Sequence, residues 1–145
     1  MIRTLSFLTL VAAMAAVAPA ATMGAELKKL VVKCVEKAEA TPDDMFLEFE
    51  VDGIPVAFAK DKQPGTSREN TVSMKNGTMF TFEQATLDAL KFEKTLVIRI
   101  KDKDITRNEP IGTMNLDPGD VSNTYVTKGK DVGAYEYHVD YTTTK

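Results

Sequence analysis

The sequence is poor in the residues that build disulfide frameworks, zinc sites and nucleophilic catalytic centres. Its 145 residues include one cysteine, Cys34, one histidine, His138, and no tryptophan. A single cysteine cannot form an internal disulfide, and one cysteine with one histidine cannot hold zinc alone. Cys34 alternates with Leu30 and Val32, which favours a buried small side chain, and His138 falls on the polar side of a strand pattern. Because no cysteine partner or serine elbow accompanies His138, we expect that the protein is not an enzyme and has no catalytic residues.

Long apolar runs are also scarce, and the one that exists lies at the N-terminus. It covers residues 5–17, follows the basic residue Arg3, and precedes an Ala-Pro-Ala sequence of the kind that signal peptidase accepts. A membrane-spanning helix needs about 20 apolar residues, so this run is too short to span a bilayer. The pattern indicates a secretory signal peptide, and an uncleaved membrane anchor is the alternative.

We therefore expect a signal peptide at residues 1–20, cut as late as residue 25, followed by one domain at residues 26–145 that is secreted or periplasmic. The domain would carry no transmembrane segment. Without Arg3, 17 basic residues remain against 21 acidic ones, a net charge of −4. A nucleic-acid-binding protein would normally present a basic surface, so this balance excludes nucleic acid as the expected partner.

Alternation with a period of two dominates the rest of the chain and predicts β-strands. In the segment MFLEFEV, residues 45–51, apolar residues share one face and glutamates share the other. The same alternation occurs in TLVIRIK at 95–101 and AYEYHVDY at 134–141. Further strand candidates lie at 29–36, 55–60, 70–74, 78–83 and 111–116.

Turn residues separate these strands. Asp52-Gly53 and Asn76-Gly77 are typical of hairpins, and Pro64-Gly65 and Pro118-Gly119 are typical of tight reversals. One short helix of at most two or three turns is expected at 83–92. Eight short strands with this spacing predict an all-β fold, an eight-stranded antiparallel β-sandwich.

The order of several short motifs resembles that of a C2 domain, the calcium- and phospholipid-binding β-sandwich family, over most of residues 27–142. The segments are LKKLVVKCVEKAEA, DDMFLEFEV, NGTMFTFE, LVIRIKDKD with NEPIGTMNL, and GAYEYHVDY. The sequence departs from the family in lacking its tryptophan ahead of the NGTMFTFE segment. The chain thus resembles C2 domains, and the resemblance implies a divergent, single-domain member of that family.

The resemblance implies a calcium site in two loops at one end of the sandwich. The paired aspartates of the family's third loop match Asp102 and Asp104, and Glu109 falls near its later acid. The first loop is several residues shorter than usual and keeps only Asp44, with Asp43 or Glu39 as a stand-in for the missing ligand. Calcium takes six to eight oxygen ligands, so both loops must contribute to one site.

The same resemblance implies weak calcium-dependent binding to anionic phospholipid membranes. Lys103 and Arg107 flank the acids and would face lipid phosphates, while Ile105 at the loop tip would touch the membrane. Acidic loop residues are also common as solvated turn formers. The alternative is therefore a calcium-independent β-sandwich with a structural role or a protein partner, using a sheet face or an exposed edge strand.

Overall fold

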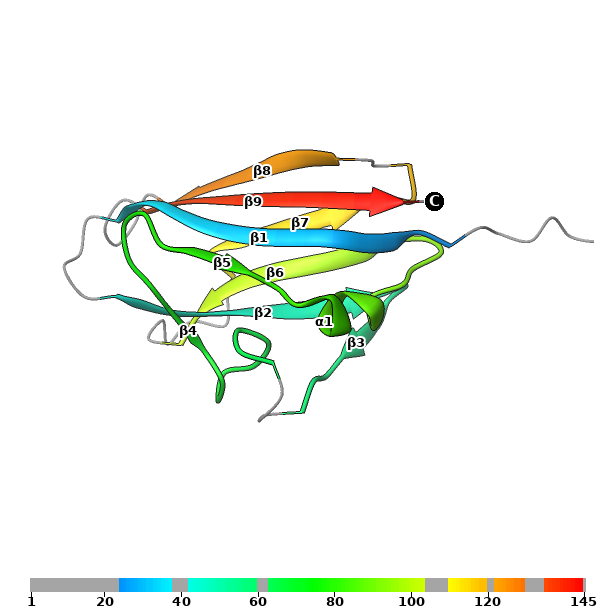
Figure 1. Ribbon diagram of the computed structural model, residues 1–145, viewed down its shortest axis with the longest axis horizontal. Helices are drawn as coiled ribbons and strands as arrows, with labels where there is room; N and C mark the ends of the chain where they lie inside the picture. The colour runs from blue at the N-terminus through cyan, green and yellow to red at the C-terminus, as the bar shows by residue number, and fades with distance from the viewer. Residues whose placement is uncertain are drawn as a thin grey trace, which may run out of the picture.

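The fold is a sandwich of two antiparallel β-sheets, drawn in Figure 1 from the computed structural model. The structure describes residues 24–37, 42–59, 63–103, 110–119, 122–129 and 135–144. The four-stranded sheet has the order β5-β1-β9-β8, and the five-stranded sheet has the order β3-β2-β6-β7 with β4 also paired to β2. The elements are β1 (Glu26–Lys37), β2 (Asp43–Val51), β3 (Ile54–Val56), β4 (Val72–Met74), β5 (Met79–Thr81), α1 (Gln84–Asp88), β6 (Leu96–Asp102), β7 (Gly112–Leu116), β8 (Ser122–Gly129) and β9 (Tyr135–Thr144).

The all-β class and the antiparallel sandwich predicted from the sequence are confirmed, with differences in detail. All eight predicted strands are present, and the described residues contain a ninth, β8, which the sequence pattern did not reveal. The helix is a single short one, α1, at one end of the predicted range. No helix within the described ranges has both the length and the apolar character to cross a membrane.

The core lies between the sheets and is filled by the alternating apolar side chains of the long strands. These side chains bury almost completely because each strand turns every second residue toward the opposite sheet. The central strands supply Leu30, Val32 and Cys34 from β1, Met45, Leu47 and Phe49 from β2, Leu96, Ile98 and Ile100 from β6, and Tyr137, Val139 and Tyr141 from β9.

The two Asx-Gly dipeptides behave differently. Asp52 and Gly53 both have positive φ, 51° and 85°, and join β2 to β3 as a two-residue hairpin. Asn76-Gly77 also forms a turn, with a Gly77 φ of 83°, but the hairpin expectation is wrong there. Strand β4 pairs with β2 and β5 pairs with β1, so this turn carries the chain from one sheet to the other. The local dipeptide specifies the turn, whereas tertiary packing decides which strands pair.

Asp52 also anchors the segment that leads into β6. Its carboxylate accepts hydrogen bonds from the backbone N–H groups of Glu93 (2.9 Å), Lys94 (2.7 Å) and Thr95 (3.0 Å). These donors hold the pKa of Asp52 below its ordinary value of 3.8 because they stabilise the ionised form, and the N–H of Glu93 contributes most. The carboxylate therefore joins the β2–β3 turn to the start of β6.

Replacing Asp52 with alanine should lower the melting temperature at neutral pH, because three N–H donors lose their acceptor and a residue poorly suited to positive φ enters the turn. Since the folded-state pKa is depressed, the carboxylate stabilises the fold above pH 3.8 and loses that effect as the pH falls through the lowered pKa. Thermal unfolding from pH 7 to pH 2 tests this. Asp52→Asn tolerates the positive φ and should lose this pH dependence while costing less than alanine. Equal melting curves for wild type and Asp52→Ala at pH 7 would contradict the assignment.

The two sheets meet at one corner, where β7 and β8 approach. Thr127 donates a hydrogen bond from its Oγ1 to the carbonyl oxygen of Ile111 (2.7 Å), and its side chain is buried. A Cβ on Gly112 would lie only 2.7 Å from Thr127 Oγ1 and 2.8 Å from Thr127 Cβ. Position 112 therefore requires glycine because of the close approach of β8.

Candidate functional site

Predicted acidic residues at the start of β2 and at the end of β6 lie next to one another. Met45 of β2 pairs with Asp102 of β6, and the backbone N–H of Lys103 donates to the carbonyl oxygen of Asp44 (3.0 Å). Asp43 and Asp44 at the start of β2 thus stand beside Asp102 at the end of β6. The antiparallel register brings together acids that are far apart in the sequence.

The three acids point to different sides of the sheet. Asp43 points toward the core, as Met45 does two residues later, and is only 8% exposed. Asp44 is half-buried on the opposite face of the strand. Asp102, the last residue of β6, is half-buried and lines a groove on the outer face of β2 and β6. Asp43 therefore points toward the core, away from Asp44.

Asp43 has a specific partner in the opposite sheet. The buried hydroxyl of Tyr137, on β9, donates a hydrogen bond to Asp43 Oδ2. Burial, together with the carboxylate of Asp43 and the nearby thiol of Cys34, raises the pKa of the Tyr137 hydroxyl far above its usual range. The hydroxyl therefore stays protonated and remains a donor. Its hydrogen bond to Asp43 joins the two sheets near the strand ends where Asp43 and Asp102 lie.

Three segments outside the described ranges are bounded by strand ends at this same end of the molecule, on the left of Figure 1. They are residues 38–41 between β1 and β2, 104–109 between β6 and β7, and 130–134 between β8 and β9. The predicted residues Glu39, Asp104, Ile105, Arg107 and Glu109 fall in them and lie outside the described residues. Lys103, the last described residue before the second segment, is exposed. In the described part of the chain, no group of three His, Cys, Asp or Glu side chains is arranged to hold a metal ion.

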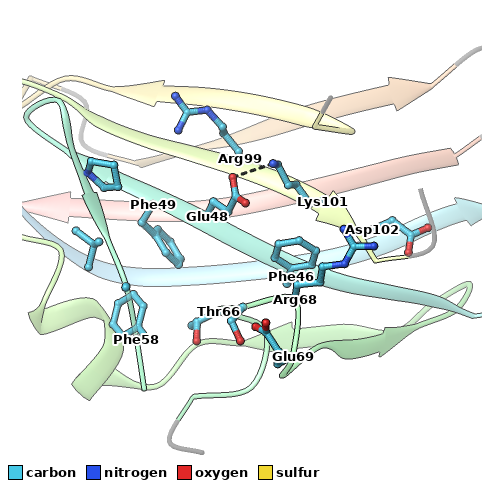
Figure 2. A pocket seen from close by; sticks show the side chains of 14 residues that line it. Phe46, Glu48, Phe49, Phe58, Thr66, Arg68, Glu69, Arg99, Lys101 and Asp102 are labelled. Carbon is cyan, nitrogen blue, oxygen red and sulfur yellow. Dashed lines mark ion pairs between the residues drawn. The ribbon is translucent and has the colours of Figure 1, made fainter. Parts of the chain in front are cut away.

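Next to Asp102 lies a groove of about 530 Å³ that the sequence did not predict. Its floor is the outer face of β2 and β6, where Lys101 forms an ion pair with Glu48 (2.9 Å), and Arg99 pairs with Glu50 (3.0 Å). Figure 2 shows the groove from close by, with Arg68 on the side of Asp102. Arg68 Nη2 donates to the carbonyl oxygen of Lys103 (3.1 Å), which connects the groove wall to the end of β6.

One signal in the sequence could have revealed the groove. Phe46 lies on the face of β2 that carries Glu48 and Glu50, yet it is 5% exposed. An aromatic residue among charged residues on the outer face of a strand indicates that another segment covers it. Here the cover is residues 66–69, which line the groove together with Phe58.

The chain was compared with family models, curated proteins and solved structures. No protein-family model matches the chain, and no curated protein matches its sequence. Among solved structures, the chain is similar to one described as "Structure of a C2 domain". The match has a TM-score of 0.42 and 11% sequence identity, and it covers 84% of this chain and 98% of the other.

Proposed function

We propose that this protein is a C2-like binding module that binds anionic phospholipid weakly through calcium held at the loop end of the sandwich. The observation that supports the proposal best is the pairing of Met45 with Asp102 and the hydrogen bond from Lys103 to Asp44. These contacts place carboxylates from two distant segments at one end of the fold. One loop alone cannot provide the six to eight oxygen ligands that calcium takes.

The proposed ligand set is Asp44 and Asp102 together with Asp104 and Glu109. Asp43 is a weaker candidate than the sequence suggested, because its carboxylate accepts a hydrogen bond from the buried Tyr137 hydroxyl. Backbone oxygens and water would complete the shell. Sites with few carboxylates bind calcium weakly, and extracellular calcium modules have dissociation constants of about 10⁻⁴ to 10⁻³ M. Such a site would be occupied where free calcium is near millimolar.

The lipid contact would come from cations next to the acids. Lys103 is exposed at the end of β6, and Arg107 follows it in the sequence. Each basic residue near an anionic membrane surface contributes on the order of 1 kcal/mol to binding. Ile105 between them would contact the membrane. Calcium is the bridge in this mechanism, so a chelator should release the protein from the lipid.

Adding calcium should raise the melting temperature of the wild-type protein, because a ligand that binds only the folded state stabilises it by mass action. At a free calcium concentration of ten times the dissociation constant the stabilisation is about 1.4 kcal/mol. Asp102→Asn should weaken calcium binding about tenfold or more by calorimetric titration. The matched control is Asp88→Asn, an exposed aspartate on α1 at the other end of the molecule, which should bind calcium like the wild type (Figure 1).

Liposome co-sedimentation separates the two parts of the proposal. Vesicles containing phosphatidylserine should bind the wild-type protein with calcium and release it with chelator, and Asp102→Asn should not bind under either condition. Calcium binding without vesicle binding would overturn the lipid assignment alone. No change in melting temperature at several millimolar calcium would overturn the whole mechanism.

A further inference from the structure

Strand β8 is the longest edge strand in the described part of the structure. The edge strands β3, β4 and β5 have three residues each and β7 has five, whereas β8 has eight. In Figure 1, β8 runs along the outside of the four-stranded sheet, with β9 on its inner side. Its pairing with β9 runs from Ser122 to Gly129 without a register shift. A long, regular edge presents a row of backbone groups with no partner strand.

The side-chain hydrogen bonds show which residues of β8 point outward. Ser122 Oγ donates to the carbonyl oxygen of Tyr141, which therefore faces β8 at the position paired with Asn123. The N–H of Thr124 bonds instead to the Asn123 side chain (2.8 Å). Because hydrogen-bonded and non-hydrogen-bonded pairs alternate in an antiparallel ladder, Thr124 and Val126 direct their N–H and C=O groups away from β9. Among the described residues, no turn or loop backbone bond involves these groups, and the Thr124 N–H is bonded locally to the Asn123 side chain.

The usual protections of an edge strand are missing from this part of β8. Residues 122–127, SNTYVT, contain no charged residue, no proline and no glycine, and most of them are β-branched or aromatic residues that favour strands. Val126 is 43% exposed on the outer face, while Tyr125 packs partly against the core. The chemistry of this edge therefore suits a second extended, uncharged strand.

We propose that β8 pairs antiparallel with β8 of a second copy of this chain, forming a two-fold symmetric dimer with one continuous eight-stranded sheet. The same edge on both partners is self-complementary, as a two-fold interface requires. With the axis at Tyr125, the outward-facing Thr124 lies opposite Val126 of the copy, and the two tyrosines lie opposite each other. β-branched and aromatic cross-strand pairs are stabilising, and this register places no like charges opposite each other between residues 123 and 127.

The dimer is weak, because one added strand on each side buries less than the roughly 1,200 Å² of a standard interface. It is also independent of calcium, since the described acidic residues of the calcium proposal lie on β2 and β6. Sedimentation of the purified protein in chelator should show a monomer–dimer equilibrium between about 1 and 100 µM. A wild-type protein that stays monomeric at about 100 µM overturns the proposal.

Two substitutions at Val126 locate the interface. Val126→Pro removes an N–H that points away from β9, so the bonds within the sheet remain and the fold should be kept. Val126→Lys places a charge on the edge. Each should raise the dimer dissociation constant at least tenfold, with wild-type circular dichroism. The matched control is Asn115→Lys, an exposed position on the edge strand β7, which should dimerise like the wild type. A dimer that tolerates Val126→Pro uses another surface.

Disulfide cross-linking tests the register. Cys34 is fully buried, so a cysteine introduced on the edge strand β8 is the reactive thiol in the folded protein. Tyr125→Cys should form a covalent dimer under mild oxidation because residue 125 faces its own copy across the axis, whereas Val126→Cys should not. If Tyr125→Cys lowers stability, the double variant Thr124→Cys with Val126→Cys should cross-link instead. Efficient self-linking of Val126→Cys would overturn this register.

Discussion

Replacing Tyr137 with phenylalanine should lower the free energy of unfolding by about 1–3 kcal/mol, because the change leaves a buried carboxylate without its donor from the opposite sheet. The ring itself is retained, so the loss comes from the hydroxyl alone. Tyr137 is fully buried and Asp43 is 8% exposed, so water cannot readily replace the missing hydrogen bond. Urea denaturation measures the effect as a lower midpoint with an unchanged m-value.

A double-mutant cycle distinguishes this contact from general packing. In the wild-type background, Asp43→Asn should be destabilising because a charge-assisted hydrogen bond becomes a neutral one. In the Tyr137→Phe background, the same substitution should be stabilising, because a buried neutral amide suffers less than a buried carboxylate from the loss of the Tyr137 hydroxyl. A change of sign between the backgrounds measures the coupling of the two side chains. Additive effects would show that the hydroxyl and the carboxylate do not interact.

Replacing Gly112 with alanine should also cost about 1–3 kcal/mol, through overpacking at the corner between the sheets. The new Cβ would come within 2.9 Å of three side-chain atoms of Thr127, including Cβ, which belongs to β8 and cannot rotate away. Relief requires that β7 and β8 move apart, which would break the hydrogen bond from Thr127 Oγ1 to Ile111. Thermal unfolding should show a lower melting temperature without loss of β-sheet circular dichroism.

The compensating variant at this corner is Thr127→Gly. On its own it should be destabilising, because it removes a buried side chain and a hydrogen bond and places glycine in a strand. In the Thr127→Gly background, Gly112→Ala should cost little, since the atoms that it would meet are gone. Thr127→Ser is the matched control, because it keeps the Cβ at 2.8 Å and should give no relief. An equal cost of Gly112→Ala in all three backgrounds would mean that the strain lies elsewhere.

The strands with a strong apolar alternation were predictable from the sequence, and β8 was not. Strands β2, β6 and β9 each bury every second residue against the opposite sheet, so their alternation matches their burial. Strand β8 has only one sheet neighbour and turns mainly Tyr125 and Thr127 toward the interior. The start of β8, Ser122 to Thr124, is entirely polar, and Tyr125 and Val126 are adjacent, so the strand has no apolar alternation to detect. Its pairing with β9 becomes visible only in three dimensions.

The alternation that predicts the strands also predicts part of the candidate site. The phase of Met45 and Leu47 already implies that Asp43 points inward and Asp44 outward, so the sequence contained the signal that separates these two aspartates. The partner of Asp43 was not predictable, because Tyr137 lies on another sheet and the alternation shows only that it is buried. The closeness of Asp44 to Asp102 likewise depends on the register between β2 and β6, which no local pattern specifies.

The strand order constrains the sequence of events during synthesis. Strand β9 is the last described strand to leave the ribosome, yet it pairs with β1 on one side and β8 on the other. Until it emerges, β1 and β8 have no common neighbour and the four-stranded sheet cannot close. Contacts between such distant parts of a chain make folding slow, with rates typical of β-sandwiches in the range of milliseconds to seconds. The nascent chain should therefore remain open until translation has passed β9.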